Sequence, residues 1–284
     1  MSSLPQVVTT KTDLRTAMSK WRAMCLRVGV VPTMGALHEG HLSLVLAARS
    51  ECDVTVATIF VNPTQFAPHE DLAKYPRTLE ADLNLLAREK TDLVFVPAND
   101  EMFPANFSTF VDPPRVALQL EGRFRPNHFR GVATVVLKLF QLVDAQVAYF
   151  GQKDFQQCLV VRHMVSDLNV PIEIRICPIV REPDGLAMSS RNRFLSPAER
   201  QQALAISRSL DAGSQLIERG ERLSAAVRET MRRVLREDGI ERVDYIAVAD
   251  PESLIESESI SFPVVLLIAA FVGQTRLIDN RLVG

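Results

Sequence analysis

The 284-residue chain lacks a long apolar run and an excess of basic charge. Its longest apolar stretch, residues 263–272, is about half of the roughly 20 residues that a membrane-spanning helix needs. The polar N-terminus has no apolar core of a signal peptide. A net charge of −2 and a pI near 6.2 argue against the basic face that a large nucleic-acid footprint needs. We therefore expect a cytoplasmic protein that binds neither membranes nor nucleic acid.

The chain also has few cysteines, and they do not cluster. Cys25, Cys52, Cys158 and Cys177 are widely spaced, lie in apolar segments and form no C-x-x-C pair. This pattern argues against a zinc site and favours reduced, buried thiols.

What the chain does have, over its first 180 residues, is an alternation of short apolar runs and helical patterns. Runs rich in Val and Ile predict strands at 28–31, 54–60, 93–96, 146–150 and 172–176. The stretches between them predict helices at 42–49, 79–88, 132–143 and 155–168. Continuous apolar strands that alternate with helices indicate a parallel sheet covered on both faces. The fold class is therefore α/β, a doubly wound Rossmann-like sheet.

The rhythm changes at the turn over 181–185. Ser196, Pro197 and Glu199 form a helix start with a serine cap, a proline in the first turn and a returning glutamate. Two helices, ending near 218 and 236, precede strands predicted at 243–248, 264–271 and 276–278. We expect two domains, a Rossmann-like domain at 1–180 and a smaller α+β domain at 181–284.

The most informative segment is Pro32–Leu42, which follows the first predicted strand and holds His38 and His41. A strand, a glycine turn and a helix together point N–H groups and a positive dipole end outward, which makes an anion site. Histidine donors there can stabilise charge that builds on a phosphate. The alternative is a pair of surface histidines. The flanking strand and helix favour the phosphate site, at the sheet edge where ligands bind.

Two further loops follow predicted strands. In the first loop, Asn62 and Gln65 can hold a small polar ligand through their amides. The alternative is that this segment is only a loop with a turn-forming Asn-Pro pair. In the second loop, Gly151 allows close approach of a ligand and Lys153 supplies a charge for phosphate. Asp154 can accept from ribose hydroxyls or merely cap the next helix, while Gln157, one turn into that helix, can still face the crevice.

Three segments complete the set. Met188-Ser189-Ser190-Arg191 suits a mobile phosphate clamp, with a polar linker as the alternative. Asp82 offers a carboxylate for Mg²⁺, although exposed helix acids usually bind no metal. The basic and aromatic segment 123–131 either reaches an anion or decorates the surface.

Together, and in this order, these motifs resemble the pantothenate synthetase (pantoate–β-alanine ligase) family of the cytidylyltransferase-like nucleotide-binding superfamily. The resemblance covers nearly the whole chain and is densest over 30–195. It implies that pantoate attacks the α-phosphorus of Mg-ATP to give pantoyl adenylate and pyrophosphate. β-Alanine then displaces AMP. It also implies a homodimer joined through the first domain.

The resemblance assigns roles residue by residue. The residues that would hold the triphosphate and the developing charge are His38, His41, Lys153, Ser189, Ser190 and Arg191. Those that would lie along the rest of the nucleotide are Met34, Gly151, Asp154, Val180 and Met188. Those that would bind pantoate are Met34, Gln65 and Gln157, with Asn62 close by. Asp82 is the weaker candidate for magnesium.

Four positions depart from the family pattern. Asn127 stands where the family usually has Gly, and because asparagine tolerates a left-handed backbone, we expect the turn to survive. Gln152, Phe155 and Ala67 replace the more usual Glu, Tyr and Gly. These changes bear on loop details and not on the reaction.

Three rival functions remain open. An adenylyltransferase acting on a phosphorylated substrate would use the same crevice, but such enzymes usually lack amides like those of Gln65 and Gln157. A tRNA synthetase would need an anticodon-binding region and a basic face. A nucleotide sensor without turnover would not need Lys153, both histidines and the Ser-Ser-Arg loop together.

Overall fold

The computed structural model describes residues 4–67 and 70–284, which form two compact units. The first unit comprises Met1–Pro114, Arg125–Gly151 and Gln157–Pro178. The second comprises Arg115–Phe124, Gln152–Gln156 and Ile179–Gly284. Two short segments from the first 180 residues therefore belong to the C-terminal unit, a grouping that a single cut in the sequence cannot express.

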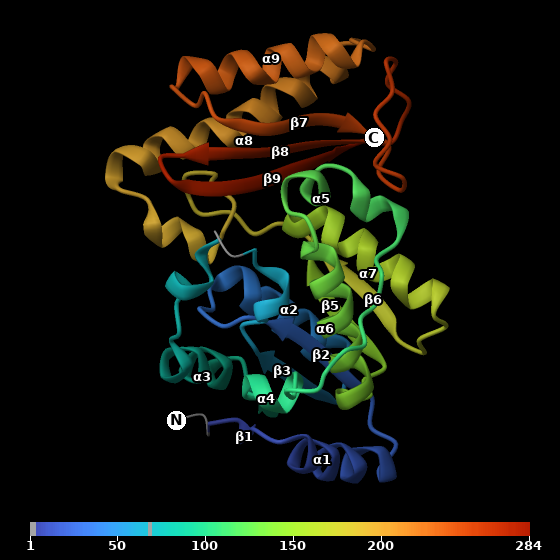
Figure 1. Cartoon of the computed structure of the whole chain (residues 1–284). Helices are drawn as coiled ribbons and strands as arrows, with labels where there is room; N and C mark the ends of the chain where they lie inside the picture. The colour runs from blue at the N-terminus through green and yellow to red at the C-terminus, as the bar shows by residue number, and fades with distance from the viewer. Residues whose placement is uncertain (1–3, 68–69) are drawn as a thin grey trace. The chain divides into compact units, whose positions relative to one another are not determined.

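The first unit is built on a six-stranded sheet in which every neighbouring pair of strands is parallel (Figure 1). In spatial order its strands are β1 (Gln6–Val8), β4 (Leu93–Phe95), β3 (Val54–Ile59), β2 (Val28–Thr33), β5 (Val147–Gly151) and β6 (Glu173–Cys177). The predicted doubly wound parallel sheet is confirmed. From β2 the chain builds outward through β3 and β4, and β5 then starts the other half. The carboxyl ends of β2 and β5 thus flank the topological switch point, where ligands bind in such sheets.

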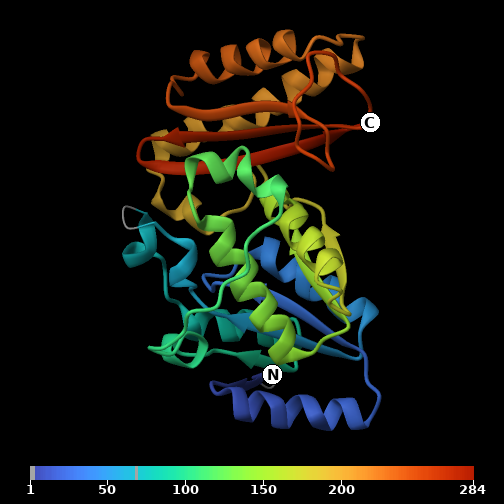
Figure 2. The ribbon, with the colours of Figure 1, turned by 45° about the vertical axis from the view of Figure 1, so that its right-hand side comes forward.

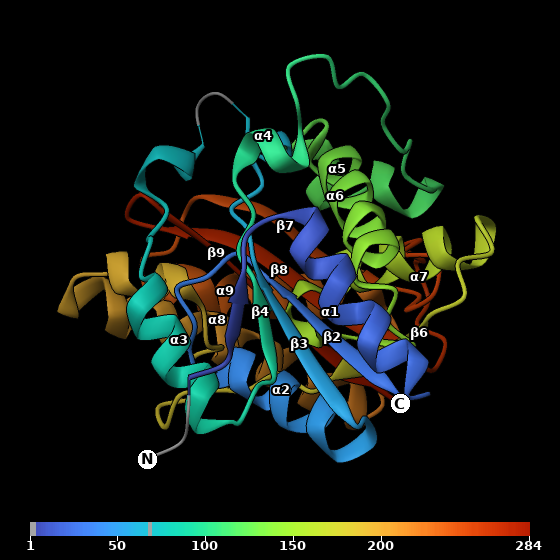
Figure 3. The same cartoon turned by 90° about the horizontal axis from the view of Figure 1, so that it is seen from below.

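Helices cover both faces of this sheet (Figure 3). The helices that lie mainly in this unit are α1 (Lys11–Ala23), α2 (Glu39–Glu51), α3 (Leu79–Arg88), α4 (Asn99–Met102), α6 (His128–Val143) and α7 (Phe155–Asp167). Helices α2 and α3 pack on one face, where Leu42, Val45 and Leu86 meet Val31 and Tyr149 in one buried cluster. Helices α1 and α6 lie on the other face. The short 3-10 helices η1 (Pro63–Gln65) and η2 (Asp71–Lys74) follow β3.

Helix α6 is buried nearly all round and begins four residues before the predicted start. Asn127 precedes it with φ 67° and ψ −4°, so the left-handed turn expected at this departure from the family pattern is confirmed. Gly131 permits close packing of α6 on η1, because an added Cβ would lie 2.3 Å from the Thr64 carbonyl oxygen.

The second unit has a three-stranded antiparallel sheet with two long helices on one face (Figure 2). Its main elements are α8 (Pro197–Glu218), α9 (Ser224–Glu237), β7 (Val243–Ala249), β8 (Val264–Val272) and β9 (Thr275–Val283). The predicted helix start is confirmed: the Ser196 hydroxyl accepts from the Glu199 N–H at 3.3 Å, and the Glu199 carboxylate accepts from the Ser196 N–H at 2.8 Å. The two inserted segments form η3 (Arg115–Leu118), α5 (Glu121–Phe124) and η4 (Gln152–Asp154).

All four cysteines are free. The expectation of buried thiols is right for Cys158 but wrong for Cys25, which is exposed, and Cys52 and Cys177 are partly exposed. Cys25 lies just past the end of α1, in a turn with φ 54°, and so is not part of the buried face of that helix. No helix among the described residues is long and apolar enough to cross a bilayer.

Candidate functional site

The turn between β2 and α2 is braced by Asp82, a buried residue of α3. The backbone N–H groups of Ala36 and Leu37 donate to its carboxylate at 2.9 Å and 2.8 Å, and the Thr78 hydroxyl donates at 3.2 Å. Gly35 is required here, since its φ is 81° and an added Cβ would lie 3.1 Å from Asp82 Oδ2. Asp82 is 2% exposed. Its observed role is to hold this turn, and its assignment to magnesium stays a prediction.

His38 and His41 stand at the amino end of α2, with ring centroids 4.1 Å apart. The backbone N–H of His38 donates to Nδ1 of His41 at 3.4 Å, a long hydrogen bond. A backbone N–H can only donate, so this contact favours Nδ1 of His41 as the acceptor, with the proton on Nε2. His41 therefore carries an N–H donor beside a helix N-terminus, which is what an anion site requires.

Asn62 and Gln65 meet on the loop after β3. The Asn62 side-chain NH₂ donates to Gln65 Oε1 at 3.0 Å and to the Gly131 carbonyl at 3.2 Å, while its Oδ1 accepts from Thr64. The Gln65 NH₂ donates to the Met34 sulfur at 3.2 Å. The structure thus brings together Met34 and Gln65, both predicted to bind pantoate. Asn62 is 1% exposed and orients Gln65 through its own amide.

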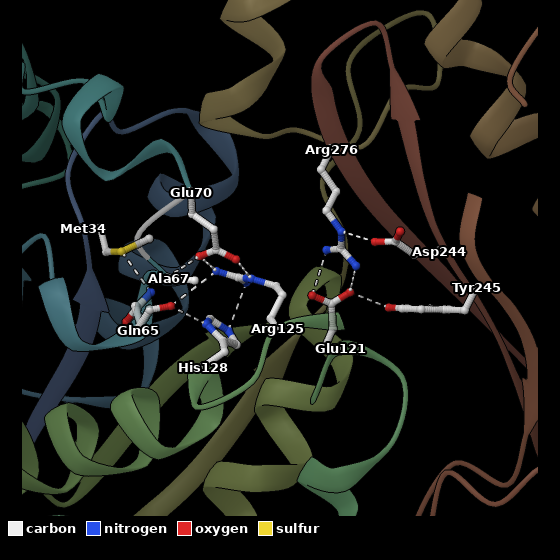
Figure 4. A network of polar contacts seen from close by, with 10 residues as sticks. All are labelled: Met34, Gln65, Ala67, Glu70, Glu121, Arg125, His128, Asp244, Tyr245 and Arg276. Atoms are coloured by element: carbon white, nitrogen blue, oxygen red, sulfur yellow. Dashed lines mark hydrogen bonds and ion pairs between the residues drawn. The ribbon is translucent and has the colours of Figure 1, made fainter. Parts of the chain in front are cut away.

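A charged network holds the backbone of the same loop (Figure 4). Arg125 donates to Glu70 through Nε at 2.7 Å and through Nη2 at 2.9 Å, and its Nη1 lies 3.2 Å from Nε2 of His128. Nδ1 of His128 lies 2.9 Å from the Gln65 carbonyl oxygen. The carbonyl only accepts and the guanidinium only donates, so these two contacts favour the tautomer of His128 with its proton on Nδ1.

This network shows the structural role of Arg125 within the segment 123–131. Its side chain is 13% exposed and is paired with Glu70, so it does not merely decorate the surface. Burial by itself would raise the pKa of Glu70, but the hydrogen bonds and charge of Arg125 hold that pKa below its usual value. The ion pair fixes the loop that carries Gln65.

Gly151 and Gln157 belong to the same unit as the histidines. An added Cβ at Gly151 would meet no described heavy atom within 4 Å, so packing among the described residues does not require glycine there. Close approach of a ligand remains the predicted reason for it. Gln157 is partly exposed in the first turn of α7.

Lys153 and Asp154 lie on η4 in the second unit. The Lys153 ammonium is 3.9 Å from Asp154 Oδ1, and the Lys153 side chain is 19% exposed. The Asn280 side-chain NH₂, from β9, donates to the backbone carbonyls of Gln152 and Lys153 at 2.9 Å and 3.0 Å. The backbone of Lys153 is thus fixed to the C-terminal strand.

The segment 115–124 is held both to Gln156, at the start of α7, and to the sheet. The Gln156 NH₂ donates to the carbonyls of Val116 and Gln119 at 2.7 Å and 2.8 Å, and its Oε1 accepts from the Glu121 N–H at 3.0 Å. Arg276 of β9 then pairs with the Glu121 carboxylate through Nη1 at 2.8 Å and Nη2 at 2.7 Å.

Two residues of β7 complete this second network (Figure 4). The Tyr245 hydroxyl donates to Glu121 at 2.8 Å, and the Asp244 carboxylate accepts from Arg276 at 2.7 Å. Burial raises the pKa of Tyr245, with the Glu121 charge adding to the shift. Burial would lower the pKa of Arg276, but hydrogen bonds and charges from Glu121 and Asp244 raise it.

The loop that enters the C-terminal part is closed like a small hairpin. The Met188 N–H donates to the Val180 carbonyl at 3.0 Å, so these two residues, both predicted to lie near the nucleotide, are neighbours. The Ser189 hydroxyl accepts from the Arg191 N–H at 3.3 Å and caps η5 (Ser190–Phe194). Ser190 is 8% exposed. The Ser-Ser-Arg segment is therefore the capped start of a 3-10 helix and not a featureless linker.

The residues that hold these loops were not found from sequence motifs. Glu70 carried no motif of its own, and His128 lies in the segment 123–131 without a predicted role in holding a loop. Asp279 and Asn280 follow the apolar pair Leu277 and Ile278 and ended the predicted strand at residue 278, although β9 continues to Val283. The apolar pair Leu282 and Val283 beyond them is the signal that could have extended the strand and placed Asp279 and Asn280 inside it, where a buried polar group requires a partner.

Known proteins were compared with the chain. The family described as Pantoate-beta-alanine ligase matches residues 6–282. Pantothenate synthetase 1 of Bradyrhizobium diazoefficiens is 52% identical over 276 residues, covering 97% of each chain. Pantothenate synthetase of a Roseiflexus species is 54% identical over 275 residues, covering 97% of this chain and 98% of the relative.

Solved structures agree. Pantothenate synthetase of Thermus thermophilus superposes with a TM-score of 0.93 at 44% identity, covering 97% of this chain and 98% of that one. A pantoate–β-alanine ligase of Francisella tularensis, whose structure is described as complexed with β,γ ATP and β-alanine, has a TM-score of 0.82 at 32% identity, covering 98% of this chain and 97% of that one. The chain belongs to the pantoate–β-alanine ligase family of enzymes.

Proposed function

We propose that this protein condenses pantoate with β-alanine to pantothenate through a pantoyl adenylate, consuming ATP and releasing AMP and pyrophosphate. Family membership and the ligands named for the Francisella relative support the substrates. The observation that carries the proposal is the contact between Met34 and Gln65, which follow the adjacent strands β2 and β3, with His41 in the first turn of the helix after β2. A side chain suited to donate to an anion and an amide suited to bind an acid thus follow neighbouring strands, which supports the proposal.

In the first step, a pantoate carboxylate oxygen bonds to the α-phosphorus of ATP, and the bond to the β-phosphate oxygen breaks. Negative charge develops on the leaving pyrophosphate. His41 supplies a donor from Nε2, the α2 N-terminus adds its dipole, and Lys153 adds a full positive charge. Ser189, Ser190 and Arg191 complete the phosphate contacts. Gln65, held by Asn62 and His128, binds pantoate.

In the second step, the β-alanine amine attacks the acyl carbon of the adenylate. The acyl C–O bond breaks, AMP leaves with the former carboxylate oxygen, and the amine loses a proton as the amide forms. No side-chain nucleophile is required, so catalysis rests on positioning and on charge stabilisation.

Magnesium enters this proposal as the partner of the ATP phosphates. Among the described residues, no group of three or more His, Cys, Asp or Glu side chains could hold a metal ion. Asp82 directs its carboxylate oxygens to backbone N–H groups of the turn, which fits a brace better than a ligand. We therefore assign no step of the reaction to a protein-bound metal.

One assay tests the proposal against its rivals. Purified protein with Mg-ATP should release pyrophosphate only when pantoate is added, and AMP and pantothenate should accumulate only when β-alanine is also present. Pyrophosphate release driven by a phosphorylated acceptor would favour an adenylyltransferase. ATP binding with no turnover under either condition would favour a sensor.

The resemblance to the family also leads us to propose a homodimer joined through the first domain, in the cytoplasm. Light scattering coupled to gel filtration should give twice the chain mass of 31.7 kDa. A monomer mass over the working concentration range would contradict the assembly without affecting the proposed chemistry.

A further inference from the structure

We propose that Asp279 and Asn280, neighbours on β9, are positioning residues that fix the two loops predicted to hold the ATP phosphates. The inference rests on the proposed function, because it assumes that Lys153 and Arg191 contact ATP. Successive side chains of a strand point to opposite faces, so this dipeptide can hold one loop on each side of the sheet. All residues in the argument belong to the second unit.

Asn280 holds the loop that carries Lys153. Its NH₂ donates to the carbonyls of Gln152 and Lys153, and its Oδ1 accepts from the Gln152 side chain at 3.2 Å. Asn280 is 2% exposed, and these bonds satisfy both donors and the acceptor of its side-chain amide. Because one side-chain amide donates to two consecutive carbonyls, the backbone of Lys153 is held at a fixed position relative to β9.

Asp279 holds the loop that leads to Arg191. Its carboxylate accepts from Arg181 Nη1 at 2.7 Å and from Nη2 at 3.0 Å, a two-pronged pair in which the Asp279 side chain is 2% exposed. Arg181 Nη1 also donates to the Gly185 carbonyl at 3.1 Å, which closes the hairpin bridged between Arg181 and Ala187. Residues 188–191 follow this bridge directly.

The chemistry of the two side chains favours positioning over simple stabilisation. A buried ion pair or amide contributes little net stability compared with well-packed apolar residues, because its desolvation offsets its interactions. Such groups fix the orientation of their partners, because a bidentate carboxylate or an amide with two donors forms both of its hydrogen bonds in only one relative geometry. Here the Asn280 amide donates to backbone carbonyls of one predicted phosphate loop. Asp279 acts through Arg181, whose guanidinium donates to a backbone carbonyl of the hairpin that leads to the other loop.

The test compares ATP binding with pantoate binding. Asn280→Asp removes the two-donor NH₂ and places an acceptor against two carbonyls. We expect the Kd of Mg-ATP, measured by calorimetry without pantoate, to rise about tenfold. The Kd of pantoate should stay within about twofold. Leu282→Ala is the matched control: it lies two residues along the same strand, is 51% exposed, and should leave both constants unchanged.

A double-mutant cycle separates positioning from a general structural role. In a Lys153→Ala background, Asn280→Asp should change the Mg-ATP Kd by less than about twofold, because its effect runs through Lys153. Asp279→Asn should likewise add little to Arg191→Ala, yet combine additively with Lys153→Ala. Additive effects of Asn280→Asp and Lys153→Ala would overturn the inference.

Two further outcomes remain distinguishable. If the unmodified protein does not bind Mg-ATP, the proposed function is wrong, and the inference that rests on it is wrong as well. If that protein binds Mg-ATP and a folded Asn280→Asp binds it equally well, only the inference fails. Should Asn280→Asp not fold, Asn280→Ser keeps one hydroxyl donor and should weaken Mg-ATP binding by about threefold. Unchanged binding in that variant would overturn the inference.

Discussion

A long hydrogen bond of 3.4 Å runs from the His38 N–H to Nδ1 of His41. Because a backbone N–H can only donate, this contact favours the tautomer in which Nδ1 accepts and Nε2 carries the proton. For His128 the contacts favour the other tautomer, because Nδ1 faces the Gln65 carbonyl and Nε2 faces the Arg125 guanidinium. At the scale of single residues, roles are therefore set by neighbours that a sequence motif does not name.

His41→Ala should lower the rate of adenylation by about 10²-fold or more, the scale of losing one oriented donor to a developing charge. The measurement is single-turnover pyrophosphate release with pantoate and Mg-ATP. His163→Ala, a partly buried histidine of α7, is the control and should react at the normal rate. A near-normal rate in a folded His41→Ala protein would remove His41 from the mechanism.

Asp82→Asn should lower the free energy of unfolding by about 1–3 kcal/mol, because one backbone N–H of the turn loses its acceptor. Urea titrations with and without Mg²⁺ measure this difference. Equal losses in both conditions agree with a brace. Unchanged stability together with a higher Mg²⁺ requirement for turnover would instead support the magnesium assignment.

At the scale of elements, apolar periodicity predicted five of the six parallel strands and the helices between them. It missed the short helices α4 and α5, and it missed β1 and α1. Two of the three residues of β1 are exposed, and α1 buries only Leu14, Ala17 and Met18, so neither element has a continuous apolar signal. The cap at Thr10, whose hydroxyl accepts from the Asp13 N–H at 3.1 Å, was the available sign of α1.

The link between Glu70 and Arg125 predicts a dependence of stability on pH. Because the pKa of Glu70 is lowered in the folded protein, its pairing stabilises the fold fully above its unfolded pKa, near 4.5, and less as the pH falls through the folded value. Glu70→Gln should therefore lower the free energy of unfolding by about 1.5–3 kcal/mol at pH 7. This difference in stability between the unmodified protein and the variant should become smaller below pH 4.5.

Urea unfolding midpoints of the unmodified protein and of Glu70→Gln, measured from pH 3.5 to pH 7 in steps of about half a pH unit, give this difference in stability. Glu173→Gln is the matched control, since Glu173 is 53% exposed in its pairs with Arg27 and Arg175 and should cost less than about 1 kcal/mol. A constant gap for Glu70→Gln across the whole pH range would contradict the assignment of its lowered pKa to pairing.

The contact between α6 and η1 gives a further prediction. In Gly131→Ala the new Cβ would overlap the Thr64 backbone, and η1 would have to shift with Gln65. We expect a loss of about 1–3 kcal/mol in unfolding free energy and a higher KM for pantoate, with the KM for β-alanine less affected. Steady-state kinetics measure both constants. An unchanged KM for pantoate would show that the position of η1 does not govern binding of that acid.

At the scale of the whole molecule, the sequence indicated an α/β part followed by an α+β part. It could not indicate that 115–124 and 152–156 are grouped with the C-terminal unit. That grouping depends on the Glu121–Arg276 pair and on the Asn280 amide, which join residues more than 120 positions apart. Local periodicity carries no information on such pairs. Motifs could predict the candidate site residues, but they could not predict the residues that hold the loops of that site in place.

The central claim is that pantoate is activated as an acyl adenylate. Pantoate labelled with ¹⁸O in its carboxylate should be turned over with Mg-ATP and β-alanine, and the AMP analysed by mass spectrometry. The account predicts one ¹⁸O in each AMP, transferred when the acyl C–O bond breaks. Unlabelled AMP, or label in inorganic phosphate released together with ADP, would contradict it.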